Sequence, residues 1–138
     1  MPFVPLHVYS GYSFEKSGLK IDQYVKAAKK IGYTALGLSD FASLSGMPIF
    51  VHECEQNNIK PIVAEDFYFD NLLFTFVVLN EVGYRNLLQL NYQNSQGKLN
   101  LRFLKEHNVG LATILTIQND AIKKAYLTLP DPLPLTPP

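Results

Sequence analysis

Hydrophobic positions along the chain form two kinds of pattern that alternate: short continuous runs, and residues repeated at helical spacing. Short apolar runs predict buried strands at residues 3–8, 34–38, 60–64 and 109–115. Apolar residues at helical spacing predict helices at residues 21–31, 46–57, 82–92, 101–106 and 120–127. Strands that alternate with helices are typical of an α/β fold with a mainly parallel sheet, either open or rolled into a barrel.

Two features interrupt this alternation. Asp70 and Asn71 lie between the apolar runs 67–69 and 72–79, which predicts a hairpin turn. Near the end of the chain, five of the nine residues from 130 to 138 are proline, and this composition predicts an extended, exposed tail. We therefore expect one α/β domain over residues 1–129 and a proline-rich tail over residues 130–138.

Composition narrows the class of protein. The chain has 138 residues, of which 47% are hydrophobic and 17% charged, as in a globular domain. Lysine plus arginine and aspartate plus glutamate each number 12, and this balance argues against a basic surface that binds nucleic acid. The single Cys54 has no partner for an internal disulfide, and no apolar run reaches the roughly 18 residues that span a bilayer. These features predict a soluble, cytoplasmic protein.

Candidate chemistry lies where three predicted strands end. The residues at these ends are His7 with Tyr9, Asp40 with Phe41, and Glu65 with Asp66. If the strands are parallel, their carboxyl ends share one rim, which is where β/α proteins bind ligands. Imidazole and carboxylate groups suit zinc, manganese or iron, and a cluster of such ions hydrolyses phosphoesters. The alternative is structural, with a histidine satisfied in the core and aspartates that cap helices or form turns.

Four segments carry a resemblance to a known family. They read FVPLHVYSGYS, ALGLSDFASLSGMPIF, NNIKPIVAEDFYF and VVLNEVGYRNLLQL. In this order and spacing, from Phe3 to about Thr116, the chain resembles the PHP domain (polymerase and histidinol phosphatase). More narrowly, it resembles the PHP domain at the N-terminus of bacterial DNA polymerase III alpha subunits, the C-family replicative polymerases. The resemblance implies a distorted, TIM-like β/α barrel, of which this chain supplies about the first half.

The resemblance places some metal ligands of the family on residues that retain a donor atom. The first histidine of the family falls on His7, and the aspartate after the second strand falls on Asp40. The glutamate after the third strand aligns with Asp66, with Glu65 beside it as a substitute. The resemblance therefore implies a vestigial metal site made of one imidazole and two or three carboxylates.

Other ligand positions are lost. Tyr9 stands where the family has its second histidine, and its phenol, with a pKa near 10 in model peptides, is a weak ligand at neutral pH. Phe41 stands where the family has another histidine, and its ring has no donor atom. The cysteine expected after the strand at 109–115 is absent from residues 116–118. We expect no tightly bound cofactor, with weak binding of zinc, manganese or magnesium as the remaining alternative.

The retained and the lost ligand positions leave three candidate functions. The favoured one is a non-catalytic PHP module of DNA replication, which is structural or binds a partner, because polymerisation (the nucleotidyltransferase activity of a DNA-directed DNA polymerase) belongs to another domain of such subunits. Its implied partners are the remainder of the alpha subunit, the proofreading exonuclease subunit or a second copy of the chain. The second is a metal-dependent phosphoesterase with a reduced site. The third, binding of a small phosphorylated ligand, lacks a glycine-rich phosphate loop.

Overall fold

The computed structural model of the chain describes residues 3–13, 17–116 and 128. Within these residues the strands form one four-stranded sheet in the order β1-β2-β3-β4. The strands are β1 (Ala35–Leu38), β2 (Lys60–Phe69), β3 (Leu72–Val78) and β4 (Leu111–Thr116). The helices are α1 (Ile21–Ile31), α2 (Met47–Gln56), α3 (Glu81–Ser95) and α4 (Leu101–Glu106). The helix expected at 120–127 and the tail at 130–138 lie outside the described residues.

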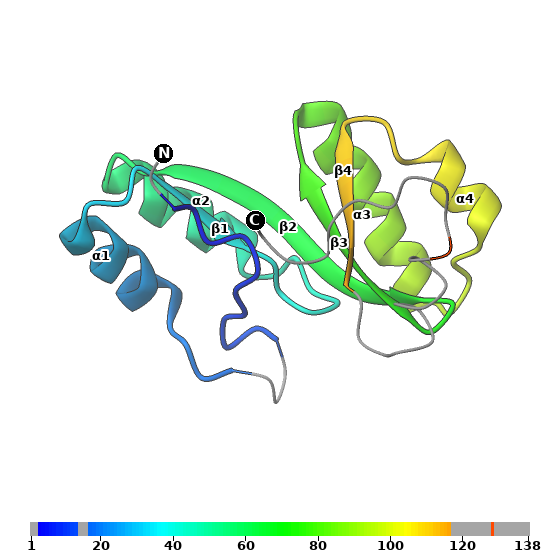
Figure 1. Ribbon diagram of the computed structural model, residues 1–138, viewed down its shortest axis with the longest axis horizontal. Helices are drawn as coiled ribbons and strands as arrows, with labels where there is room; N and C mark the ends of the chain where they lie inside the picture. The colour runs from blue at the N-terminus through cyan, green and yellow to red at the C-terminus, as the bar shows by residue number, and fades with distance from the viewer. Residues whose placement is uncertain (1–2, 14–16, 117–127, 129–138) are drawn as a thin grey trace.

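The long strand β2 joins the two halves of the molecule. Its first half pairs in parallel with β1, from Ala35↔Lys60 to Leu38↔Val63. Its second half pairs antiparallel with β3, from Ala64↔Val77 to Phe69↔Leu72. Figure 1 shows the result, with α1, β1 and α2 along one end of the curved β2 and β3, β4, α3 and α4 around the other end. The change of partner occurs in the middle of β2, beside the candidate site.

The sheet is mixed, and the expectation of a mainly parallel sheet is wrong for the described strands. Only the β1–β2 pair is parallel, whereas the β2–β3 and β3–β4 pairs are antiparallel. The reason is the predicted hairpin, which is confirmed: Asp70 and Asn71 both have positive φ, 51° and 61°, as a two-residue turn of this kind requires. Strand spacing alone does not reveal that β3 lies between β2 and β4.

The first predicted strand is also wrong. Residues 3–8 run beside β1 but form no regular ladder of hydrogen bonds with it, and Phe3 is 71% exposed rather than buried. Two backbone bonds tie this segment to β1, from the Gly37 amide to the Pro5 carbonyl and from the Ser39 amide to the Val8 carbonyl, each 2.9 Å. Pro5 has no amide hydrogen, and the unequal spacing of the two bonds breaks the register of a parallel ladder.

The segment approaches β1 closely because Gly37 has no side chain. A Cβ atom at Gly37 would lie 2.5 Å from the Pro5 carbonyl oxygen, which is too close for any side chain. This contact brings His7 and Tyr9 to the end of β1. The glycine therefore helps to build the candidate site.

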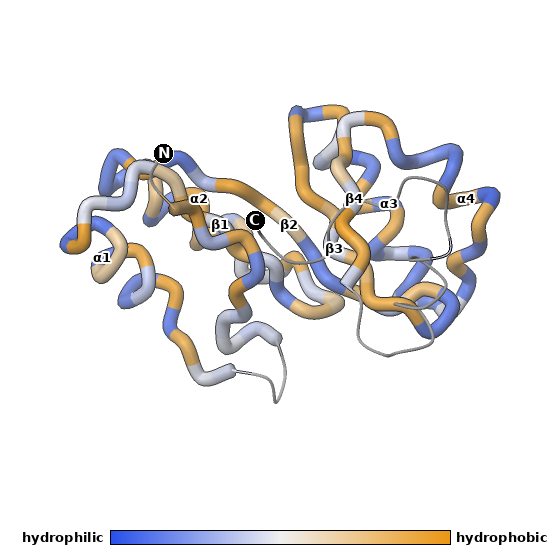
Figure 2. Tube along the Cα trace, viewed as in Figure 1, coloured by the Kyte–Doolittle hydropathy of each residue, from blue (hydrophilic) through white to orange (hydrophobic). Residues whose placement is uncertain are grey.

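Each half of the molecule has its own apolar core. The first lies between α1, α2, β1 and the start of β2, and its largest fully buried residues are Phe50, Leu36, Leu38 and Met47. The second packs Phe67 and Phe76 of the sheet against Leu87 and Leu90 of α3. Leu44 contacts both cores. Figure 2 shows that the hydrophobic first part of β2 gives way to a hydrophilic stretch near the middle of the strand, where the sequence has Glu65 and Asp66.

The helices follow the sequence prediction closely. Helix α1 has the predicted bounds and ends at Gly32, whose φ of 103° is left-handed. Helix α3 begins one residue earlier than predicted, after Asn80, whose side chain caps it by accepting a hydrogen bond from the Gly83 amide at 2.9 Å. It also ends later than predicted, at Ser95. No helix in the described part of the chain is long and apolar enough to cross a membrane.

Candidate functional site

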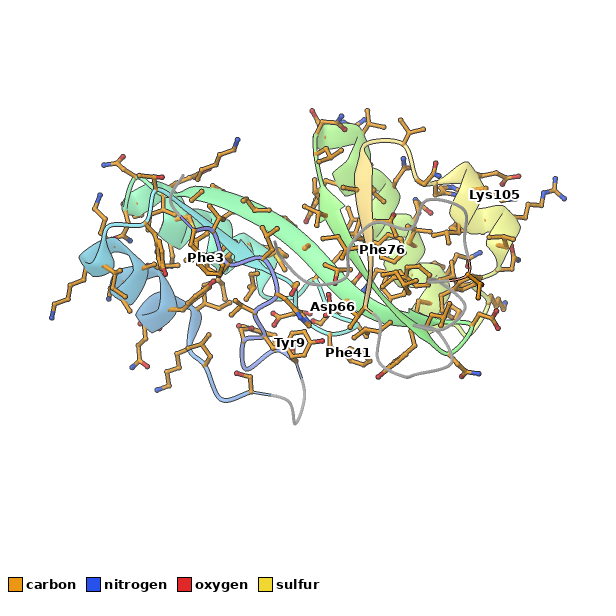
Figure 3. The ribbon with its side chains drawn as sticks, viewed as in Figure 1. Phe3, Tyr9, Phe41, Asp66, Phe76 and Lys105 are labelled. Atoms are coloured by element: carbon orange, nitrogen blue, oxygen red, sulfur yellow. The ribbon has the colours of Figure 1, made fainter. Side chains whose placement is uncertain are left out.

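The candidate site lies where three segments meet beside the middle of β2. The N-terminal segment supplies His7 and Tyr9, the loop after β1 supplies Phe41, and β2 supplies Asp66. Figure 3 shows Tyr9, Phe41 and Asp66 close together below β2. A parallel bridge joins Phe41 to Asp66, and the Asp66 amide donates to the Asp40 carbonyl at 3.1 Å. The backbone itself therefore holds two of the predicted strand ends together.

Asp66 is fully buried, and both its carboxylate oxygens are occupied by side chains. The Tyr9 hydroxyl donates to Oδ2 at 2.7 Å, and His7 Nε2 lies 2.6 Å from the same oxygen. The Thr75 hydroxyl of β3 donates to Oδ1 at 2.6 Å. We call His7, Tyr9, Asp66 and Thr75 the Asp66 network. Thr75 was not predicted from the sequence, because it faces Asp66 only through the direct pairing of the two residues in the hairpin.

Tyr9 acts in this network as a proton donor. Burial and the hydrogen bond to Asp66 raise the pKa of Tyr9 well above its ordinary value. The phenol therefore stays protonated at neutral pH and keeps its O–H directed at the carboxylate. A protonated phenol is a poor metal ligand, and here its hydroxyl already uses Asp66 Oδ2 as its acceptor.

Asp40 is held by a second set of buried groups. The Ser10 amide and hydroxyl each donate to it at 2.6 Å, and the Ser13 hydroxyl donates at 2.8 Å. Ser13 in turn accepts the Phe41 amide at 2.8 Å. We call Ser10, Ser13 and Asp40 the Asp40 network; all three are fully buried. Neither serine was predicted as a site residue; the signal in the sequence is the pair of serines in the motif YSGYS, directly after the first predicted strand.

Glu65 lies on the other face of β2. The sequence predicted a strand over residues 60–64 that ends at Glu65 and Asp66, but β2 continues through both, and consecutive strand residues point to opposite faces. Glu65 Oε2 accepts a hydrogen bond from the Asn91 amide of α3, and Oε1 is buried with no partner among the described residues. Burial raises the pKa of Glu65 to about 8. Glu65 therefore faces α3, on the side of β2 opposite to Asp66.

Phe41 belongs to a row of aromatic rings. His7 and Tyr9 have ring centres 5.2 Å apart, Tyr9 and Phe41 6.5 Å, and Phe41 and Tyr68 5.7 Å. We call His7, Tyr9, Phe41 and Tyr68 the aromatic surface. Three of the four, His7, Tyr9 and Phe41, are predicted strand-end residues, and Phe41 brings a hydrocarbon ring to this place.

The residues present do not fit a metal centre. Among residues 3–13, 17–116 and 128, no three His, Cys, Asp or Glu side chains are grouped to hold a metal ion. Asp66 and Asp40 are both buried and fully engaged by neighbouring donors. A metal would have to displace the Tyr9 and His7 contacts to reach Asp66. No catalytic step through a metal follows from this arrangement.

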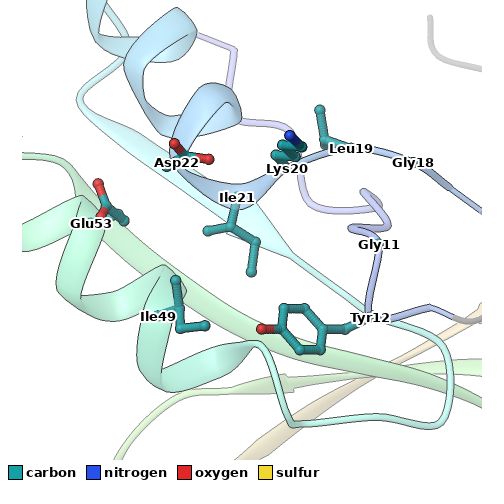
Figure 4. A pocket seen from close by; sticks show the side chains of 9 residues that line it. All are labelled: Gly11, Tyr12, Gly18, Leu19, Lys20, Ile21, Asp22, Ile49 and Glu53. Carbon is teal, nitrogen blue, oxygen red and sulfur yellow. The ribbon is translucent and has the colours of Figure 1, made fainter.

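A separate pocket lies between the start of α1 and α2. Figure 4 shows Tyr12, Ile21 and Ile49 directed toward one another between the two helices. Lys20, Asp22 and Glu53 also line this pocket, but no residue of the Asp66 network does. It is therefore distinct from the candidate site.

Comparisons with known proteins identify the family. The chain is 30% identical over 117 residues to a DNA polymerase III subunit alpha of Streptococcus pyogenes serotype M3, covering 82% of this chain and 11% of that protein. It is 32% identical over 124 residues to the same subunit of Bacillus subtilis, covering 83% of this chain and 11% of that protein. The chain thus spans about a tenth of the length of these relatives.

Two further findings complete the comparison. A solved structure described as a putative metal-dependent phosphoesterase from Bifidobacterium adolescentis is similar with a TM-score of 0.45 and 12% identity, over 77% of this chain and 42% of that chain. The family model of the PHP domain matches residues 5–125, which is most of the sequence. The chain therefore belongs to the PHP domain family.

Proposed function

We propose that this chain is the N-terminal PHP module of a DNA polymerase III alpha subunit, or a stand-alone relative, and that it is structural or partner-binding rather than catalytic. The similarity to alpha subunits over 82% of the chain supports the first part. The observation that carries the second part is the hydrogen bond from Tyr9 to Asp66, at 2.7 Å. A side chain of the protein occupies the carboxylate that a metal ion would need.

The chemistry of the whole donor set supports this proposal. A multinuclear metal centre requires several unshared lone pairs directed at one point. Here Tyr9 and Thr75 donate protons to Asp66, and Phe41 contributes a hydrocarbon ring. The site is vestigial in this proposal, with His7, Asp40 and Asp66 as remnants and Glu65 outside it. Any remaining affinity for zinc, manganese or magnesium is weak.

Metal analysis tests the proposal. The purified full chain is dialysed against metal-free buffer, and zinc, manganese and iron are measured per chain. We expect well below one equivalent of each. A stoichiometric metal that resists a chelator would contradict the proposal and would mean that the Asp66 network rearranges around an ion.

A reduced phosphoesterase is the second candidate, and one contact favours it. His7 Nε2 and Asp66 Oδ2 lie 2.6 Å apart, so one imidazole and one carboxylate of a metal site do meet. The test is turnover of a generic phosphoester by the full chain, with His7→Ala as the comparison. The His7 side chain is 53% exposed, so its removal leaves the cores intact. We expect no turnover in either protein, whereas turnover lost in His7→Ala would favour the phosphoesterase.

We also propose that the fold is a partial, distorted β/α barrel that self-associates. Ile114 and Leu115 of β4 are exposed, and among the described strands β4 lies at the edge of the sheet, where backbone groups are left without a strand partner. A second copy, the remainder of an alpha subunit or a proofreading exonuclease subunit would cover this edge in the cytoplasm. Light scattering at micromolar concentration tests the second copy: a dimer is expected, and a clean monomer of 15.6 kDa would contradict it.

A further inference from the structure

A groove separates α2 from α3 on one face of the sheet. Val63, Glu65 and Phe67 alternate along β2 and therefore share this face. Val63 packs against the first core, which α2 covers, whereas Phe67 belongs to the second core, which α3 covers. Each helix thus covers its own half of the face, and Val63 of β2 and Val78 of β3 line the groove between them.

Each wall of the groove is one side of a helix. Met47, Val51 and Glu55 of α2 line it at intervals of four residues, and such a spacing places side chains on one helix face. Glu81 and Tyr84 line it from the first turn of α3. The groove has a volume of about 850 Å³, which is within the range of ligand-binding clefts.

The apolar surface continues past the groove. A second hollow of about 460 Å³ shares Val63 and Val78 with it and adds Ile62 and Leu79. Leu79 is 64% exposed, and Val82 in the first turn of α3 is 53% exposed. Exposed apolar surface that extends beyond a single pocket is typical of a site that a protein partner covers. An elongated partner therefore suits this surface better than a small molecule.

The charges at the groove indicate the chemistry of that partner. Glu55 on the α2 side and Glu81 on the α3 side are both exposed, and none of the described residues that line the groove is a lysine or arginine. Glu81 pairs with Arg85 at 2.7 Å, but both side chains are exposed, and a pair of this kind contributes little. The groove therefore favours a partner with basic groups and repels the phosphates of a nucleic acid.

A helix meets these requirements. The face of a sheet offers side chains rather than free backbone groups, so it suits a partner whose own backbone hydrogen bonds are satisfied internally. Amphipathic helices bind apolar grooves in this way, through residues at helical spacing. We propose that the groove binds an amphipathic helix that is not part of this sequence, with its apolar face on Val63 and Val78 and its lysine or arginine side chains near Glu55 and Glu81. The proposal rests on the partner-binding part of the proposed function.

Three synthetic helical peptides test the proposal with the full chain. The first has leucine along one face and lysine on its flanks, the second has glutamate in place of lysine, and the third has serine in place of leucine. Each carries a fluorophore, and fluorescence anisotropy measures binding. We expect the lysine peptide to bind at micromolar concentration, the glutamate peptide to bind at least about tenfold more weakly, and the serine peptide not to bind.

Two results of this titration would overturn the proposal: no binding of the lysine peptide, or equal binding of the lysine and glutamate peptides. Peptide binding and metal content are separate measurements. A failure of the groove to bind is therefore distinguishable from a failure of the proposed function, which metal analysis tests.

Two matched variants of α2 locate the binding site. Glu55→Lys should weaken binding of the lysine peptide at least about tenfold. Glu53→Lys makes the same change of charge on the same helix, but Glu53 lines the pocket beside α1, so binding should not change. The amide signals of Val63 and Tyr84 should shift in NMR spectra when the peptide is added, and that of the exposed Tyr92 should not. Equal effects of the two lysine variants would overturn the proposal.

Light scattering distinguishes a partner helix from a second copy of the chain. Without peptide, Glu55→Lys should leave the oligomeric state of the chain unchanged. A parent dimer that becomes a monomer in Glu55→Lys would show that the groove is an interface between copies, and the proposal would be overturned.

Discussion

Glu65 and Asp66 are neighbours in β2 and are both fully buried, yet their surroundings differ completely. Asp66 faces the N-terminal segment, where Tyr9 and Thr75 donate to it and His7 contacts it. Glu65 faces α3, where the Asn91 amide reaches one oxygen and the other has no partner among the described residues. Burial alone therefore does not determine what a carboxylate does in this protein.

The comparison separates two consequences of burying a carboxyl group. A carboxyl group with enough donors has its hydrogen-bonding capacity satisfied, as neighbouring donors satisfy Asp66 and Asp40. A carboxyl group with too few donors is stabilised in its neutral form, and the raised pKa of Glu65 follows from this. On the Asp66 face of β2, hydrogen bonds connect the strand to the N-terminal segment. On the Glu65 face, the strand carries a carboxyl group with a raised pKa.

The largest expected effect on stability comes from removing the carboxylate at the centre of the Asp66 network. Asp66→Ala leaves the Thr75 hydroxyl buried without its acceptor and releases Tyr9 from β2. We expect a loss of about 3–5 kcal/mol in the free energy of unfolding, measured by urea denaturation. Glu55→Ala on the exposed side of α2 is the control and should change stability little. Equal stability of the two variants would mean that the Asp66 network contributes nothing.

The next effect is a pH dependence on the opposite face. The pKa of Glu65 is about 8 in the folded chain, against about 4.3 for an ordinary glutamate. Between these values the unfolded chain has lost this proton and the folded chain keeps it, so stability from this group falls as pH rises, by about 1.4 kcal/mol per pH unit.

Glu65→Gln isolates this contribution, because glutamine does not titrate and still reaches Asn91. The stability of the variant minus that of the parent should increase steadily as pH rises from about 5 to about 8. Urea denaturation of both proteins at several pH values measures this difference. A difference that stays constant with pH would show that Glu65 has an ordinary pKa in the folded chain.

A smaller effect is expected in the Asp40 network. Ser13→Ala removes one donor to Asp40 and leaves the Phe41 amide without its acceptor. We expect a loss of about 1–3 kcal/mol in thermal or urea unfolding. The exposed Ser45 gives the matched control, Ser45→Ala, which should be neutral. If the two serine variants unfold alike, the loop is not held through Asp40.

The sequence predicted the local features of this fold well. The helix at 21–31, the left-handed Gly32 and the turn at Asp70 and Asn71 all depend on residues close together in the chain, and all are confirmed. His7, Tyr9 and Asp66 do meet, as the sequence predicted, but not for the predicted reason: residues 3–8 form no strand, and Asp66 lies inside β2 rather than at its end.

The remaining features depend on residues far apart in the chain. Ser13 donates to Asp40, 27 positions away, and the Asn91 side chain donates to a glutamate 26 positions away. No local sequence pattern predicts such distant partners. The direction of β3 and β4 and the face on which Glu65 lies both depend on β2 continuing past residue 64. The apolar run ends there, because the next two residues of the buried strand are the charged Glu65 and Asp66. The limits of the domain at residues 1–129 stay a prediction.

The central claim is that hydrogen bonds from the protein have replaced metal ions at Asp66. Zinc titration of the parent chain and of the double variant Tyr9→His with Phe41→His tests this claim most directly. Removing the Tyr9 donor frees Asp66, and two imidazoles add ligands beside His7. We expect zinc affinity to rise at least about tenfold, or about 1.4 kcal/mol. Tyr92→His on α3 should bind zinc like the parent, and a double variant that binds no more zinc than the parent would contradict the claim.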